Sequence, residues 1–312
     1  MSEAPDGQPL KFSSRFLQDS RNVLYTCDTL AAMFASISRP LSGVVIDVGT
    51  GNGYFLDACL KHVEHRSDVA AVGIDPSSET RKPAGGRLFL AASGASLPLP
   101  DASISLALCH FVLSRVPTDV ARRILDEVAR VLVPGGTFLV VEPCLGMSTY
   151  HTEADQETGK MMAIARRMKA EFQREAHDVD ENFGLRLPRA LGTILKVVTV
   201  DLHIARWFTP FPETWSPDEA KIVRVRAESL ARNATFGDFV NAHGVDCPAG
   251  DEDAAGIVRA GPKLELTERG FRTLSETRSD QLLRSLDSGP GELAAPVEFI
   301  PVVRCLAVKA AR

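Results

Sequence analysis

The chain has 312 residues, 45% of them hydrophobic and 24% charged, which is enough for one large domain or a core domain with a smaller addition. Its formal net charge of −5 argues against a protein that grips long nucleic acid, because such proteins present a basic field to the phosphates. Six scattered cysteines without a CxxC pair predict no disulfide framework and favour a reducing compartment. The polar start and the lack of a long apolar stretch predict neither a signal peptide nor a membrane span, so we expect a cytoplasmic protein.

Short apolar runs alternate with amphipathic helices in the first half of the chain. We expect a first helix over 23–37, a second that carries Phe55 to Val63, and a third from Asp119 that stops at Pro134-Gly135-Gly136. The apolar runs between them predict buried strands at 44–48, 69–74, 87–91, 104–108 and 137–141. Alternation of this kind predicts βαβ units, and therefore an α/β fold with a doubly wound, mostly parallel sheet.

The pattern changes after Pro143. Helices are expected at 154–178 and 217–233, and a final strand at 299–308. Apolar residues alternate over 196–206, which favours a strand, although a helix stays open there. We therefore divide the chain into a tail and helix at 1–40, a core at 41–145, a substrate-cap and insertion region with part of the sheet at 146–296, and a last core strand at 297–312.

Three glycines, Gly49, Gly51 and Gly53, lie between the first strand and the helix that follows it. Glycine allows a tight turn and a close approach of a ligand to the backbone, and doubly wound sheets bind ligands in this crevice. A dinucleotide fingerprint needs G-x-G-x-x-G/A, but Tyr54 occupies the last small position. The spacing therefore disfavours an NAD-dependent oxidoreductase.

The segment Asp47-Val48-Gly49-Thr50-Gly51-Asn52-Gly53 resembles motif I of the class I S-adenosylmethionine-dependent methyltransferases. Three further segments resemble that family's motifs in the expected order: Gly73-Ile74-Asp75, Leu97-Pro98-Leu99-Pro100-Asp101, and the stretch from Glu127 to Gly136. The last two are similar to the ubiquinone and menaquinone methyltransferase group. The resemblance implies a Rossmann-like, seven-stranded sheet with an additional helical cap region, and S-adenosyl-L-methionine as cofactor.

The resemblance also implies which residues bind the cofactor. The glycine loop would wrap the methionine part, and Asp75 would accept hydrogen bonds from both ribose hydroxyls. Ser93 and Ser105 stand where the family often has aspartate, so adenine recognition would rest on Ser93 and the backbone of Gly94. The carbonyl of Cys109 would receive the ammonium group. The complete expected set is Asp47, Gly49, Thr50, Gly51, Gly53, Asp75, Pro76, Ser93, Gly94 and Cys109.

Methyl transfer from a sulfonium mainly requires alignment of the acceptor with the methyl group, and a general base helps for hydroxyl or amine acceptors. His110 and Glu142 are the candidate catalytic residues, and His151 is a weaker one. Two alternatives remain open: His110 as a histidine satisfied by neighbouring backbone, and Glu142 as a structural carboxylate at helix N-termini. Cys144 follows a proline, as in cytosine C5 methyltransferases, but we expect it to be a buried cysteine. No metal site is expected.

We expect a small-molecule methyl acceptor. A cluster of methionines after the fifth strand suggests a cap over an apolar substrate, with ordinary core packing as the alternative; the residues are Met147, Met161, Met162 and Met168. Four aromatics could add a further wall: Trp207, Phe208, Phe211 and Trp215. The competing hypotheses are an inactive or repurposed S-adenosylmethionine-binding accessory subunit and a nucleic-acid methyltransferase, and the latter is disfavoured by the acidic composition. The oligomeric state has no sequence signal.

Overall fold

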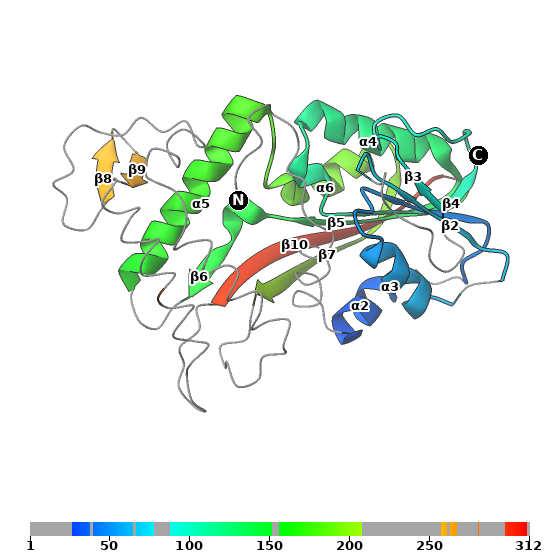
Figure 1. The fold of residues 1–312 in the computed structure, drawn as a ribbon, viewed down its shortest axis with the longest axis horizontal. Coiled ribbons are helices and arrows are strands. Elements are labelled where there is room, and N and C mark those ends of the chain that lie inside the picture. The colour runs from blue at the N-terminus through cyan, green and yellow to red at the C-terminus, as the bar shows by residue number, and fades with distance from the viewer. Residues whose placement is uncertain are drawn as a thin grey trace.

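The computed structural model describes residues 27–37, 40–64, 67–77, 88–151, 156–207, 257–260, 263–266, 280 and 297–310. Its main sheet has eight strands in the order β3-β2-β1-β4-β5-β10-β6, and β7 pairs with β10 (Figure 1). These strands are β1 (Val44–Val48), β2 (Ala70–Ile74), β3 (Leu88–Leu90), β4 (Ile104–His110), β5 (Leu132–Pro143), β6 (Thr149–His151), β7 (Lys196–Trp207) and β10 (Val297–Val308). A separate hairpin consists of β8 (Ile257–Ala260) and β9 (Lys263–Leu266).

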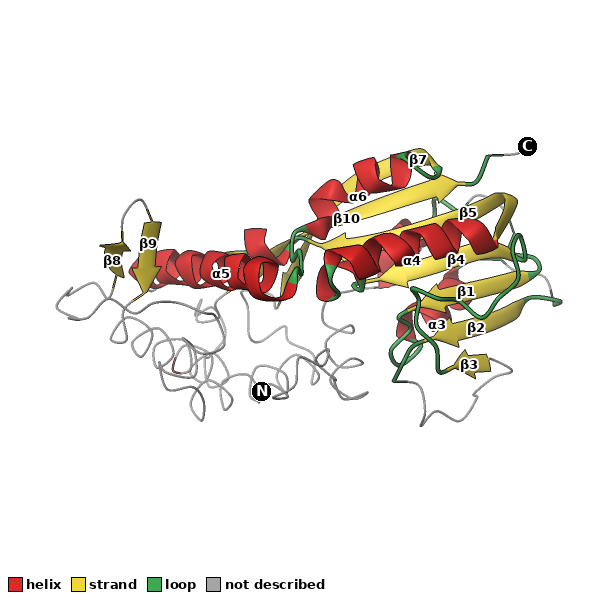
Figure 2. Cartoon of the chain, turned by 90° about the horizontal axis from the view of Figure 1, so that it is seen from above, coloured by secondary structure: helices red, strands yellow, loops and turns green. Residues whose placement is uncertain are grey.

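The strand directions confirm the predicted doubly wound, mostly parallel sheet. Neighbouring pairs from β3 to β5 are all parallel. The last strand, β10, is antiparallel to both β5 and β7, so β7 again runs in the common direction. β6 is a short addition that pairs with the part of β10 lying beyond β5, at Val297–Phe299. β3 and β7 therefore stand at opposite edges of the sheet (Figure 2).

Helices cover both faces of the sheet. α2 (Cys27–Phe34) and α3 (Tyr54–His62) pack in one apolar layer with side chains of β1, β4 and β10. α4 (Thr118–Val131) and α6 (Phe183–Gly192) pack in a second layer on the other face. The long α5 (Gln156–His177) extends away from the sheet (Figures 1 and 2). No helix of the described residues combines the length and apolarity that a bilayer crossing requires.

Several elements differ from the sequence expectations. Residues 196–207 form a strand, which settles the alternative left open there. α4 ends at Val131, and β5 begins before Pro134 rather than after the glycines. α6 was not expected because Pro188 lies inside it, where proline removes a helical hydrogen bond. The helix expected at 217–233 lies outside the described residues, and the helical cap stays a prediction.

Candidate functional site

The glycine loop after β1 adopts a backbone that only glycine takes readily. Gly49, Gly51 and Gly53 have φ angles of 70°, 52° and 80°, in the left-handed region where a Cβ is strained. A Cβ built on Gly49 would lie 2.3 Å from a methyl carbon of Val112. Glycine at this position is therefore required by conformation and by space together.

The end of β2 holds this loop in place through Asp75. The Gly49 amide donates to the carbonyl oxygen of Ile74 at 2.7 Å, and the Gly51 amide donates to Oδ2 of Asp75 at 2.9 Å. The other carboxylate oxygen, Oδ1, accepts the amide of Ser77 at 2.8 Å and its hydroxyl at 2.5 Å. The carboxylate of Asp75 thus points toward the glycine loop. A carboxylate can accept several hydrogen bonds at once, as Asp75 does here with the Gly51 and Ser77 amides and the Ser77 hydroxyl.

Asp47, the buried acid at the end of β1, also contacts the glycine loop. Its Oδ2 accepts the hydroxyl of Thr50 at 2.7 Å. This contact fixes the Thr50 side chain between the first two strand ends. We conclude that these two residues shape the loop.

A turn after β3 borders the loop on its other side. Its Ser93 hydroxyl accepts the amide of Ala95 at 3.2 Å, and a Cβ on Gly94 would lie 2.4 Å from a methyl carbon of Val48. The turn therefore presses directly on the end of β1. Ser105 lies at the start of β4, where its hydroxyl is close to the carbonyls of Ser42 and Val44, so its departure from the family pattern does not affect the crevice.

Glu142 at the end of β5 is fully buried and holds the loop that follows β4. Its Oε1 accepts the amides of Val112 and Leu113, both at 2.8 Å, and its Oε2 accepts the amide of Ser114 at 3.1 Å. Burial raises the pKa of Glu142, while these backbone hydrogen bonds lower it. The first amides of a helix have no partner within the helix, and carboxylates often accept their hydrogen bonds. Glu142 does this at the start of the 3-10 helix η2 (Leu113–Arg115). The geometry favours the structural alternative for Glu142.

His110 lies at the end of β4 between two aromatic rings. It is 3% exposed, and its ring centroid is 4.4 Å from that of Phe55 and 4.2 Å from that of Phe111. Phe111 itself has a φ of 59°, which is uncommon for a residue with a large side chain. The chain therefore turns sharply directly after His110, and Glu142 secures the far side of that turn.

The ionisable groups near the site include the buried carboxylates of Asp47 and Glu142 and the guanidinium of Arg115, which interacts with Glu142. Burial raises the pKa of the Cys109 thiol, and the carboxylates of Glu142 and Asp47 raise it further. Cys109 therefore stays a neutral thiol. Burial similarly raises the pKa of Cys144 to about 11, which does not support a thiolate nucleophile. In the part of the chain that the structure describes, no group of His, Cys, Asp or Glu could hold a metal ion.

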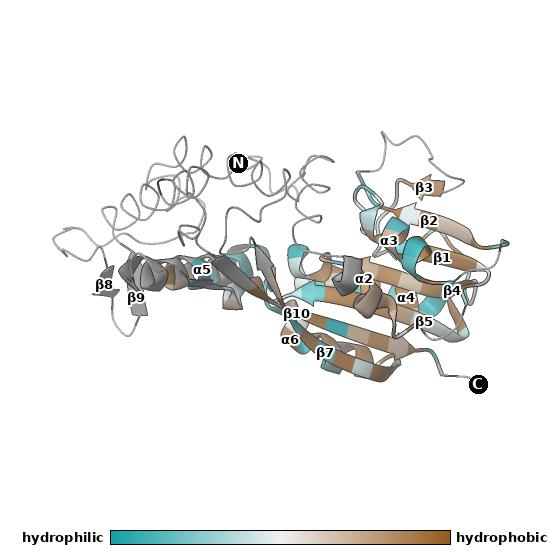
Figure 3. Ribbon diagram, turned by 90° about the horizontal axis from the view of Figure 1, so that it is seen from below, coloured by the Kyte–Doolittle hydropathy of each residue, from teal (hydrophilic) through white to brown (hydrophobic). Residues whose placement is uncertain are grey.

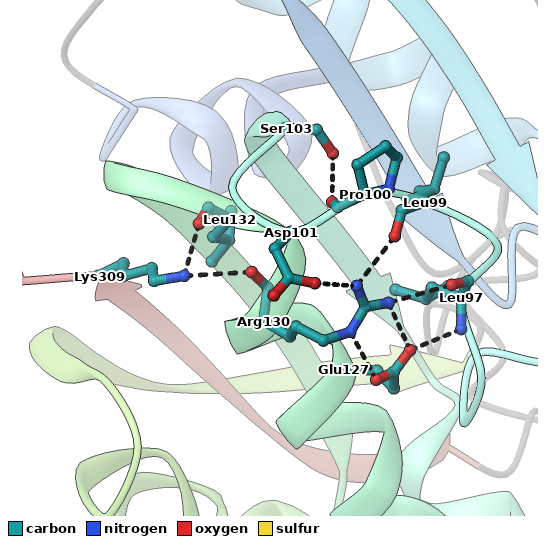
Figure 4. A network of polar contacts seen from close by, with 9 residues as sticks. All are labelled: Leu97, Leu99, Pro100, Asp101, Ser103, Glu127, Arg130, Leu132 and Lys309. Carbon is teal, nitrogen blue, oxygen red and sulfur yellow. Dashed lines mark hydrogen bonds and ion pairs between the residues drawn. The ribbon is translucent and has the colours of Figure 1, made fainter.

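The two later motifs bind each other through Arg130 (Figure 4). Its guanidinium forms a two-pronged pair with Glu127, at 2.8 Å for both contacts, and reaches Asp101 at 2.5 Å. It also donates to the carbonyls of Leu97 and Leu99, at 3.1 Å and 2.9 Å. These contacts fasten the 97–101 segment to α4, and this segment continues the chain from the Ser93–Gly94 turn.

The structure brings most of the predicted residues together at the carboxyl ends of the parallel strands. The ends of β1, β2 and β4 and the turn after β3 carry the expected cofactor set. Met147 is exposed and Met168 is buried, so these two do not share one surface. The side chains of His151, Met161, Met162 and the four aromatics lie outside the described residues. Sequence reasoning missed Phe111 and Val112, because their roles depend on partners distant in the chain, and it also missed Ser77, which bonds to Asp75 two residues before it.

Comparisons with known proteins agree with this arrangement. A family model described as "Methyltransferase domain" matches residues 46–140. An uncharacterized methyltransferase from Mycobacterium sp. (strain JLS) is 34% identical over 120 residues, covering 35% of this chain and 44% of the relative. Another from Mycobacterium bovis (strain BCG / Pasteur 1173P2) is 34% identical over 103 residues, covering 31% and 38%. The chain thus spans less than half the length of these curated relatives.

A solved structure has a similar fold. It is a protein from Anaeromyxobacter dehalogenans assigned as a type II methyltransferase, with 15% sequence identity. The match covers 92% of this chain and 98% of that one, with a TM-score of 0.51.

Proposed function

We propose that the chain transfers a methyl group from S-adenosyl-L-methionine to a small-molecule acceptor, because residues 46–140 match a family model described as "Methyltransferase domain" and contain the glycine loop and the acid expected of the class I family. The observation that carries this proposal is the 2.9 Å hydrogen bond from the Gly51 amide to the Asp75 carboxylate. It joins the glycine loop to an acid that can accept sugar hydroxyls, which is the pair of features that this cofactor would require.

The described residues carry the features that the cofactor would need. The loop at Gly49, Gly51 and Gly53 would wrap the methionine part with its left-handed backbone. This backbone packs against Val112 at Gly49 and against Phe89 at Gly53. The carboxylate of Asp75 would take the ribose hydroxyls in exchange for the Ser77 hydroxyl, which its Oδ1 accepts in this structure. The G-x-G-x-G spacing, with Tyr54 after the last glycine, disfavours a dinucleotide.

The other predicted contacts complete this assignment. Ser93 and Gly94 would border the adenine, Pro76 would lie beside the ribose, and the Cys109 carbonyl would accept the ammonium group. Asp47 and Thr50 would act by shaping the glycine loop.

The bound cofactor would supply an activated methyl group on sulfur for in-line displacement. The protein's own contribution is alignment, which can be worth effective molarities of about 10⁵ to 10⁸ M. His110 remains the candidate base, since it ends β4 directly beside Cys109. Its stacking between Phe55 and Phe111 holds the ring in one orientation. We assign Glu142 to positioning, because both of its oxygens already accept backbone amides.

Calorimetric titration with S-adenosylhomocysteine tests the binding part of the proposal. Asp75→Asn keeps the size of the side chain but loses the charge, and a hydrogen bond to a charged group is worth about 1.5–3 kcal/mol. We therefore expect at least roughly tenfold weaker binding. Asp126→Asn, on the exposed face of α4, is the matched control and should bind as the wild type does. A wild-type chain that binds NADH but not S-adenosylhomocysteine would refute the proposal.

Methyl transfer is tested separately with cofactor labelled on the methyl group. The chain is incubated with a panel of small hydroxyl, amine and carbon acceptors, and with RNA as a comparison. Label in a small-molecule product supports a transferase. Tight cofactor binding with no transfer to any acceptor supports the accessory-subunit alternative instead.

A further inference from the structure

β7 is an edge strand with apolar side chains turned to solvent. Among the described strands it pairs with β10 alone. Val198, Val200, Leu202 and Ile204 are between 49% and 66% exposed. Alternate residues of a strand share one face, so the last three form a continuous row, which we call the β7 row. Figure 3 shows β7 beyond β10 at this edge, with hydrophobic stretches along it.

Such an edge is unusual in a stable monomer. An exposed, hydrophobic edge strand offers unpaired backbone groups to any other strand, and contiguous apolar surface usually marks an interaction site. The pairing between β7 and β10 is regular from Thr199 to Trp207, and its one irregularity lies at the Val198 end. The β7 row therefore lies on a regular, nine-residue stretch that can accept a further strand.

The side chains of β7 are self-complementary in one register. A two-fold axis perpendicular to the sheet would make two copies of β7 antiparallel and leave both rows on the same face. With Leu202 on the axis, Val200 of each copy would face Ile204 of the other. On the opposite face, Asp201, which already pairs with Arg304 of its own chain, would then face His203, so no two acids would be opposed. An axis at Asp201 would instead oppose two acids, which is unfavourable.

The neighbouring layer also fits this arrangement. The row residues Val200 and Leu202 pair with Cys305 and Val303 of β10, which are buried in the layer that contains α6. The β7 rows of two copies would therefore fill the space between two α6 helices. This continues the existing apolar layer across the joint and removes it from water.

We propose that β7 is a self-association edge, at which two copies of this chain join antiparallel strands with Leu202 on the two-fold axis. The dimer would carry one continuous sheet through both molecules. The proposal does not depend on the catalytic function.

Cysteine cross-linking tests the register directly. In Leu202→Cys the two Cα atoms would lie about 4.5–5.5 Å apart across the axis, within disulfide range. In Ile204→Cys, a control of similar exposure, the two thiols would be offset by four residues, or about 13 Å. We expect oxidised Leu202→Cys to run as a reducible dimer, and Ile204→Cys and the wild-type chain to remain uncross-linked. Cross-linking through position 200 or 204 in place of 202 overturns the register.

Light scattering after size exclusion tests the association itself. The wild-type chain should have twice the mass of one chain at micromolar concentration, and Leu202→Lys should have the mass of one. Circular dichroism and thermal unfolding check that Leu202→Lys is folded. A monomeric wild-type chain, or a dimer that persists in folded Leu202→Lys, overturns the proposal.

Discussion

Replacing Glu142 with glutamine isolates the charge that holds the loop after β4. The volume of the side chain barely changes, so packing around β5 is preserved. The amide oxygen can still accept the two amides that now bond to Oε1, those of Val112 and Leu113. The amide nitrogen then faces the Ser114 amide, which donates to Oε2 in the wild type.

The magnitude follows from these contacts. One buried amide loses its acceptor, which costs about 1–3 kcal/mol, and the other two lose the charge of theirs. Burial disfavours the charged form of Glu142 and so raises its pKa. Replacing the charge with a neutral amide removes this desolvation penalty and offsets part of the loss in stability. We expect the free energy of unfolding to fall by about 2 kcal/mol. Since Val112 packs on Gly49, the cofactor loop should also loosen and bind S-adenosylhomocysteine roughly five- to tenfold more weakly.

Urea unfolding and calorimetric titration measure the two effects on the same preparations. Asp126→Asn is again the control, because it removes an exposed carboxylate and should change neither quantity. The reasoning is wrong if Glu142→Gln unfolds within about 0.5 kcal/mol of the wild type, the range of ordinary surface substitutions. It is also wrong if the stability falls but the affinity for S-adenosylhomocysteine does not.

Two further predictions concern the crevice and its support. Gly94→Ala should destabilise the chain by about 1–3 kcal/mol through overpacking against Val48, and Val48→Ala should recover part of that loss in the double variant, as a double-mutant cycle would show. Arg130 lowers the pKa of Glu127, so the ionised carboxylate stabilises the fold above its unfolded pKa near 4.5, and that contribution is lost as the pH falls through the lower folded value. Unfolding of wild type and Glu127→Gln should therefore differ at pH 7 and converge below pH 4.5; a gap that stays constant contradicts the pairing.

The core of the fold was predictable because its signals are local. Each strand from β1 to β5 contains a short apolar run, and side chains such as Val45 and Ile46 are fully buried. The glycine loop was predictable because its conformation restricts the residue type. The position of Asp75 after β2 and beside the glycine loop was expected from the resemblance of Gly73-Ile74-Asp75 to the family motif.

The missing features depend on contacts between distant residues. The positive φ of Phe111 was not expected, and the choice between the two roles left open for Glu142 depends on hydrogen bonds that span about 30 residues of sequence. α6 could have been found from the spacing of Phe183, Leu187 and Leu191, which are buried on one face of the helix, but Pro188 obscured that pattern. The exposure of the β7 row has no sequence signal, since alternation indicates a strand without saying which face is covered.

The position of β10 has a consequence for how the molecule assembles. Among the described strands, β7 pairs only with β10 (Val297–Val308), which also pairs with β5. During synthesis on the ribosome, β5 and β7 therefore cannot pair with β10 until that later segment has emerged. Because contacts between distant residues slow folding, we expect the β1–β5 half of the sheet to form before β10 joins it to β7.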